Sequence, residues 1–328
     1  MQLRKLQEMG GATLLVSLPK EWTRRASLKK GSVVSLDEAA DGGLLIYPPR
    51  DGSEEHVGRE ITIAYPSKFS NEGIPNEITA AYLLGYDLIK IAGREGISSR
   101  DRSRIISSIK LLIGLEVVEE DARTVTSQFL VDKMAVEPSK IFLRISTIVR
   151  AMIADTLRQL SSPEVSNFES VAQRDDEVDR LHFLLVRLIR TAVREPLSAS
   201  KFGLTAIDCL DYRVAASSLE TAGDYAVELS NSVSKLMGIP SEVRRRVEEI
   251  KDLLDVLQAN AVRSFVQRDF RLAQRVLEDS QKLQKLISLL REVSSDSPAE
   301  IFHLADTIER IARCQRDIGD LVSPMGPA

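Results

Sequence analysis

Two carboxylates at helical spacing are the residues best suited to do chemistry in this sequence. Glu220 and Asp224 lie four positions apart, so on a helix both project from one face. Small or apolar residues recur beside them at helical spacing: Ala215, Leu219, Ala222 and Ala226. Two carboxylates on one helical face can hold a hard cation, because such ions prefer oxygen ligands. The sequence therefore predicts a cation site beside a packed seam.

The run that carries these acids belongs to a duplicated helical unit. Leu219–Ala226 recurs in degraded form as Ile308–Gln315. From Pro138 onward the apolar periodicity is helical, with breaks at Gly238-Ile239-Pro240 and at Ser294–Pro298. Three helices on each side of the first break predict two antiparallel three-helix bundles, over residues 138–237 and 240–323. The last four helices are expected near 204–236, 241–266, 268–293 and 298–322.

The first 50 residues form a separate small β domain in this interpretation. The pattern predicts strands at 2–7, 13–18, 32–36 and 44–47, with a helical turn at 20–26. So short a segment buries too little apolar surface to be stable alone, and dimerisation is the usual remedy.

Residues 55–135 alternate between strand and helix patterns, which predicts a small α/β layer domain. Strands are expected at 60–65, 88–91, 115–118 and 125–130, with helices at 74–86 and around 105–113. The segment contains no glycine-rich phosphate loop and no nucleophile elbow. It is either a ligand-sensing module or an inert connector.

Composition sets the broad class of the protein. A chain of 328 residues with 43% apolar and 28% charged residues is typical of a soluble globular protein with two or three domains. The net charge of −4 gives no global nucleic-acid signature, but residues 1–30 hold seven basic residues against two acidic ones. This local excess is a candidate phosphate-facing patch: Arg4, Lys5, Lys20, Arg24, Arg25, Lys29 and Lys30.

The cysteines and histidines argue against several site classes. Only Cys209 and Cys314 are present, so there is no disulfide framework and no CxxC metal knuckle, and a reducing cytoplasm is expected. His56, His182 and His303 are scattered, and surface or packed roles are expected for them, with no catalytic residue predicted. No run reaches the roughly 18 apolar residues of a membrane span, so direct membrane insertion is not expected.

The Leu219–Ala226 motif, within duplicated three-helix bundles, resembles the PhoU family of phosphate-uptake regulators. Proteins of that family can bind metal clusters through acidic residues separated by three positions on facing helices. The resemblance implies that Asp175 and Asp179, on the second helix, join Glu220 and Asp224. Each pair lies one turn apart, about 6 Å between Cβ atoms, so four carboxylates could converge on Mg²⁺, Mn²⁺, Ca²⁺ or iron. The alternative is a solvated acidic face paired with neighbouring arginines: Arg174, Arg180 and Arg213.

The second repeat lacks this acidic pattern. Arg313 stands where an acid would be required four residues after Glu309, and 278–283 contains no acidic pair at the required spacing. The spacing predicts a Glu309–Arg313 ion pair instead, and a metal site in the first repeat alone.

The N-terminal segment resembles the AbrB/MazE/SpoVT class of DNA-binding domain. The similarity lies in Leu18-Pro19-Lys20-Glu21-Trp22 followed by Leu28–Val34. In that class two chains interlace their hairpins into one small barrel. The resemblance implies that Arg4, with Lys5 beside it, and Arg24 contact DNA. With their basic neighbours Lys20 and Arg25, the predicted DNA-binding set is Arg4, Lys5, Lys20, Arg24 and Arg25. The alternative is a solvated basic surface that serves only dimerisation.

Together the two resemblances predict a cytoplasmic, homodimeric regulator of phosphate uptake and homeostasis. Its N-terminal barrel would bind DNA, and its helical bundles would bind a phosphate-transporter ATPase or another signalling protein. A second hypothesis is a protein-interaction regulator of a phosphate transporter, with the barrel as a dimer clamp and no DNA binding. A third, a metal-dependent hydrolase built around Glu220, lacks a recognisable base or nucleophile, so the protein is not expected to be an enzyme.

Overall fold

The computed structural model describes residues 3–11, 13–38, 42–48, 58–67, 73–132, 135–160, 168–234, 236, 239–293 and 299–322. The chain divides into two compact units, Met1–Gly58 and Arg59–Ala328. His56, Gly238 and the predicted break at Ser294–Pro298 lie outside the described residues. In the described part, no helix is both long enough and apolar enough to cross a membrane.

The first unit has the predicted order of strand, strand, helix, strand, strand. Its elements are β1 (Gln7–Met9), β2 (Thr13–Leu15), α1 (Lys20–Arg25), β3 (Ser35–Glu38) and β4 (Leu44–Tyr47). β1 pairs antiparallel with β2, and β3 with β4, as two separate two-stranded sheets. The described residues of one chain therefore form no closed barrel. The interlaced barrel needs a second chain and stays a prediction.

Apolar side chains of this unit face solvent. Each of the following is at least 60% exposed: Leu3, Leu14, Val33, Leu36 and Leu44. A two-stranded hairpin has no second layer against which its side chains can pack. The apolar residues of this unit therefore do not form a buried core within a single chain.

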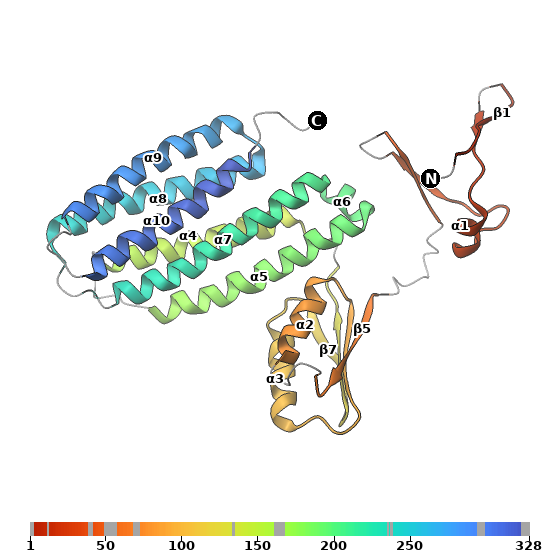
Figure 1. Ribbon diagram of the computed structural model, residues 1–328, viewed down its shortest axis with the longest axis horizontal. Helices are drawn as coiled ribbons and strands as arrows, with labels where there is room; N and C mark the ends of the chain where they lie inside the picture. The colour runs from red at the N-terminus through yellow and green to blue at the C-terminus, as the bar shows by residue number, and fades with distance from the viewer. Residues whose placement is uncertain are drawn as a thin grey trace. The chain divides into compact units, whose positions relative to one another are not determined.

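The second unit begins with an α/β layer whose strands are close to those predicted. Its elements are β5 (Glu60–Tyr65), α2 (Ile74–Leu83), β6 (Leu88–Gly93), α3 (Ser99–Lys110), β7 (Leu115–Glu120) and β8 (Thr124–Phe129). The sheet order is β5-β6-β8-β7, with β5 and β6 parallel and the other neighbours antiparallel. Helices α2 and α3 lie on the same face of the sheet (Figure 1). Ile78 and Ile105 of these helices and Ile89 and Ile91 of β6 are buried.

The remaining chain forms the two predicted three-helix repeats. The first contains α4 (Pro138–Gln159), α5 (Phe168–Arg194) and α7 (Ala206–Val233), and the second α8 (Ser241–Gln267), α9 (Phe270–Val293) and α10 (Ala299–Asp320). A short helix that the periodicity did not predict, α6 (Pro196–Phe202), precedes α7. Thr205 caps α7 with a reciprocal capping box to Asp208, which fixes where this helix begins.

Polar contacts join the two repeats within one continuous core. The Gln258 amide of α8 donates to the Ser146 carbonyl of α4 (3.1 Å), and the Gln315 amide of α10 donates to Gln258 Oε1 (3.1 Å). Arg150 of α4 donates two hydrogen bonds to Asp255 of α8, at 2.9 and 2.7 Å. These bonds fix the register of α4 against the second repeat.

A buried arginine fastens the α/β layer to α5. Arg187 Nη1 donates to the carbonyls of Tyr82 (2.7 Å) and Tyr86 (2.9 Å), and Nη2 donates to Asp87 Oδ1 (2.7 Å). Its guanidinium carbon lies 4.0 Å from the centre of the Phe129 ring. The side chain is 0% exposed, and burial lowers its pKa while Asp87 acts in the opposite direction. The α/β layer is thus fixed to the helix that also carries Asp175 and Asp179.

Candidate metal centre

Helices α5 and α7 lie side by side (Figure 1), and the small-residue seam that the sequence predicted on α7 is buried. Ala215, Leu219, Ala222 and Ala226 are at most 1% exposed. Gly223 continues the seam, and a Cβ atom added there would lie 3.2 Å from Asp175 Oδ1. The glycine therefore lets a carboxylate of α5 approach the backbone of α7 closely.

Three of the four predicted carboxylates meet between these helices. Asp179 of α5 and Glu220 and Asp224 of α7 each offer one oxygen atom, and these oxygens all lie within 4.8 Å of one another. Asp175 lies one turn before Asp179, and its buried Oδ1 has no hydrogen-bond partner among the described residues. We call Asp175, Asp179, Glu220 and Asp224 the acidic cluster.

No arginine of the described residues forms an ion pair with the acidic cluster, although the charge of Arg213 acts against the raised pKa of Glu220. Arg174 donates to Asp155 Oδ2 (2.8 Å), outside the cluster, and no ion pair in the described part of the chain joins the cluster to Arg180 or Arg213. Burial, then repulsion from the neighbouring carboxylates, raises the pKa of Asp175 to about 7. Burial also raises the pKa values of the other three acids. A divalent cation would relieve this repulsion.

Without a metal ion, we expect the free energy of unfolding to fall as pH rises from about 4 to about 7. The folded state favours the protonated form of Asp175. The contribution of this group to the free energy of unfolding is fully present below pH 3.8, the pKa in the unfolded chain, and is lost as pH rises through about 7. His182 acts in the opposite sense: its pKa falls from 6.5 to about 4, so its contribution is present above 6.5 and lost as pH falls through about 4. The raised pKa values of the other three acids act in the same sense as that of Asp175, whereas the lowered pKa of His182 opposes them.

Urea unfolding between about pH 5 and pH 8 in the presence of a chelator measures this dependence. The Asp175→Asn variant should have a flatter pH profile than the parent protein. An equally steep profile in the variant would show that Asp175 titrates normally.

His182 lies next to the acidic cluster, which the sequence interpretation missed. Its Nδ1 is 3.8 Å from Glu220 Oε1, and the side chain is 9% exposed. Burial, aided by Arg213, lowers its pKa, so the ring is neutral at pH 7. The signal was present in the spacing, because His182 follows Asp179 by three positions and so shares its helix face.

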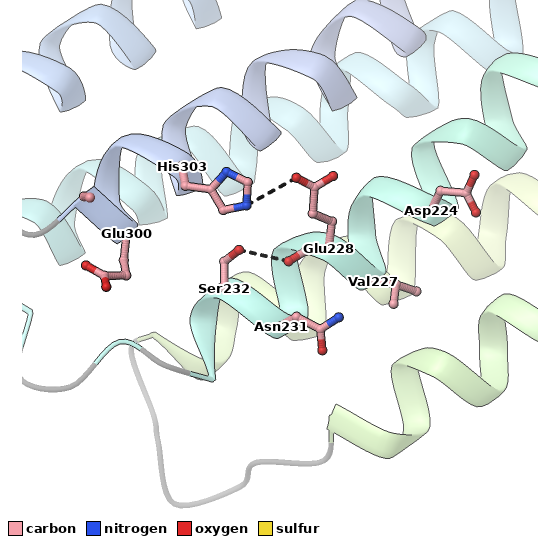
Figure 2. A pocket seen from close by; sticks show the side chains of 8 residues that line it. Asp224, Val227, Glu228, Asn231, Ser232, Glu300 and His303 are labelled. Atoms are coloured by element: carbon pink, nitrogen blue, oxygen red, sulfur yellow. Dashed lines mark hydrogen bonds and ion pairs between the residues drawn. The ribbon is translucent and has the colours of Figure 1, made fainter.

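A cleft of about 660 Å³ opens at the Asp224 side of the cluster. Asp224, Glu228 and Ser232 of α7 line it from one side, and Glu300 and His303 of α10 from the other (Figure 2). His303 Nε2 lies 3.2 Å from Glu228 Oε1, so the next acid along α7 is already paired. The cleft thus borders Asp224, the most exposed carboxylate of the cluster.

The second repeat is built differently at the corresponding helices. Glu309 accepts from Arg291 Nη2 of α9 (2.6 Å), so the predicted Glu309–Arg313 pair is wrong. On α9, Lys282 Nζ donates to Asp279 Oδ1 (2.8 Å). Both contacts pair an acid with a basic side chain, whereas no arginine or lysine of the described residues forms an ion pair with the acidic cluster of the first repeat.

The predicted DNA-binding residues are all exposed. Arg4 precedes β1 with Lys5, and the other three, Lys20, Arg24 and Arg25, lie on α1. The structure thus leaves this basic set accessible to a polyanion, within the first unit.

Two protein families have models that match this chain, one in the helical part and one in the first unit. A family model described as the PhoU domain matches residues 142–233, and one described as the antidote-toxin recognition protein MazE, a bacterial antitoxin, matches residues 9–54. No curated protein matches the chain.

Two solved structures of PhoU proteins are similar to part of this chain. The crystal structure of PhoU from Pseudomonas aeruginosa has 18% identity and a TM-score of 0.50, over 56% of this chain and 93% of that one. The phosphate transport system regulatory protein PhoU from Streptococcus pneumoniae has 15% identity and a TM-score of 0.47, over 56% and 91%. The chain therefore combines an N-terminal segment that matches the MazE model with a helical part that matches the PhoU domain, and helices α5 and α7 of that part carry the acidic cluster.

Proposed function

We propose that this protein is a phosphate-responsive regulator that binds DNA through its first unit and partner proteins through its helical repeats. The match of the PhoU domain to residues 142–233 carries the proposal, because these residues form the repeat that holds the acidic cluster. The same match supports a regulatory role rather than an enzymatic one. The partner would be a component of phosphate transport, such as its ATPase, or another signalling protein.

The acidic cluster is a cation site in this proposal. Four carboxylates fit Mg²⁺, Mn²⁺, Ca²⁺ or iron, and the unpartnered, buried Oδ1 of Asp175 lacks the positive neighbour that a structural acid normally has. A bound cation would supply positive charge that holds α5 against α7. The residues themselves would orient it, with Asp175 and Asp179 on one helix and Glu220 and Asp224 on the other.

DNA binding rests on the basic residues of the first unit. Arg24 and Arg25 end α1, and Arg4 and Lys5 precede β1, all in the unit whose residues 9–54 resemble MazE. A dimer would present each of these residues twice, and doubled phosphate contacts steepen the dependence of DNA affinity on salt. The exposed apolar residues of the same unit support a dimer under this hypothesis and equally under the competing one, a dimer clamp without DNA binding.

Replacing Arg4, Lys5 and Arg24 together with alanine should abolish a gel shift on DNA from upstream of the protein's own gene. Each basic residue removed from a phosphate contact should lower the slope of log affinity against log salt by about 1. The comparison variant is Lys29→Ala with Lys30→Ala, which removes two charges of the wider basic patch outside the predicted contacts and should weaken DNA binding less than the triple variant does. A parent protein that shifts no DNA would favour the clamp hypothesis.

Deleting residues 1–50 should weaken self-association, because the exposed apolar side chains of the hairpins would be buried in a dimer. Sedimentation of the full chain and the deletion measures this. A point variant of the full chain, Leu36→Glu, should have the same effect, since Leu36 is 60% exposed in one chain. Unchanged sedimentation of both variants would place the dimer interface elsewhere.

A further inference from the structure

The side chain of His182 is buried without a hydrogen bond. Neither ring nitrogen has a partner among the described residues, although the side chain is only 9% exposed. Phe183 stacks near the ring, with centroids 6.0 Å apart, and satisfies neither nitrogen. A buried polar group left unpaired costs about 1–3 kcal/mol, so a purely structural role would favour an apolar residue here. Two unpaired nitrogens beside an acidic cluster point to a ligand that the ring binds.

The geometry of the ring fits a metal ion shared with Glu220. Ligand bonds to a first-row transition ion are about 2.1 Å long, so two ligand atoms of one ion can lie up to about 4.2 Å apart. The 3.8 Å between His182 Nδ1 and Glu220 Oε1 falls within that limit. The carboxylate oxygens, up to 4.8 Å apart, need to approach by a few tenths of an ångström, which partly exposed side chains can do by rotation.

We propose that His182 is a nitrogen ligand of the first-repeat site and makes it selective for first-row transition ions, such as Fe²⁺, Co²⁺ or Zn²⁺, over Mg²⁺ and Ca²⁺. Imidazole suits these transition ions, whereas Mg²⁺ and Ca²⁺ prefer oxygen ligands alone. The inference rests on the proposed cation site and adds to it the class of ion. His303, the other described histidine, pairs with Glu228 instead and is not part of the ligand set.

The test compares Co²⁺ and Mg²⁺ binding by the parent protein, His182→Leu and the control His303→Gln. Co²⁺ serves as the probe because its visible absorption reports nitrogen coordination, and calorimetry gives both affinities. We expect His182→Leu to weaken Co²⁺ binding by at least about tenfold and to change the Co²⁺ spectrum, with little change in Mg²⁺ affinity. His303→Gln should bind both ions as the parent does.

Thermal melting in the presence of a chelator shows whether a variant has lost metal binding or has lost its fold. Because leucine removes two unpaired nitrogens, the metal-free His182→Leu protein should melt at or above the temperature of the parent. Equal Co²⁺ affinity and an unchanged spectrum in His182→Leu would overturn the inference while leaving the carboxylate site standing. A parent protein that binds neither ion would instead defeat the proposed cation site itself.

Discussion

Replacing Arg187 with alanine is expected to lower the free energy of unfolding by about 3–5 kcal/mol. The guanidinium is fully buried, and it pairs with Asp87 while donating to the carbonyls of Tyr82 and Tyr86. Removing it leaves Asp87, itself only 18% exposed, without this partner and opens a cavity against Phe129. The α/β layer would then lose its main polar attachment to α5.

Urea unfolding followed by circular dichroism measures this effect. The matched control is Arg190→Ala, three residues further along α5 and exposed, which should change stability by less than about 0.5 kcal/mol. A double variant, Arg187→Met with Asp87→Leu, removes both charges and should recover part of the loss. A loss below about 1 kcal/mol for Arg187→Ala would mean that the layer is held by its apolar contacts instead.

Most secondary structure could be predicted because each element has a strong local signal. The helical repeats follow from apolar spacing, as in α7, where Ala215, Leu219, Ala222 and Ala226 are all buried. The meeting of Asp179 with Glu220 and Asp224 was predictable for a related reason, since the family resemblance supplied the facing of α5 and α7. The short helix α6 was not predicted, because a helix of 7 residues is too short to show a clear helical spacing of apolar residues.

Contacts between distant segments could not be read from local spacing. In the sequence, Arg187 cannot be distinguished from an exposed arginine of a helix. Its partners Tyr82 and Asp87 lie about 100 residues earlier, and only the fold brings them into contact with it. Glu309 was predicted to pair with Arg313 at helical spacing, but in the structure it pairs with Arg291 of the facing helix α9. His182 was judged from the sequence as an isolated histidine, and only the fold shows its neighbour on α7 to be Glu220.

Glu220→Gln is expected to remove the metal ion and the stability that the ion confers. An ion present at about 100 times its dissociation constant stabilises the folded state by about 2.7 kcal/mol, and this gain should vanish in the variant. In the presence of a chelator the variant should be as stable as the parent or more so, because it relieves repulsion with Asp224 and Asp179. The effect should therefore change sign with the presence of metal.

The second repeat supplies the matched control for this variant. Glu309→Gln alters the corresponding position of α10, where Arg291 already pairs with the carboxylate. Its metal content should equal that of the parent, and any loss of stability should be the same with and without metal. A fall in metal content in Glu309→Gln would place an ion in the second repeat.

Elemental analysis of protein purified without chelator, together with melting temperatures in Mg²⁺, Mn²⁺, Ca²⁺ and Fe²⁺, tests the central claim that the first repeat is a metal centre. The account predicts a bound metal in the parent and in Glu309→Gln, its loss in Glu220→Gln, and a melting temperature that rises with metal only where the ion binds. A metal-free parent whose melting temperature ignores all four ions would contradict it and make the acidic cluster a set of surface charges.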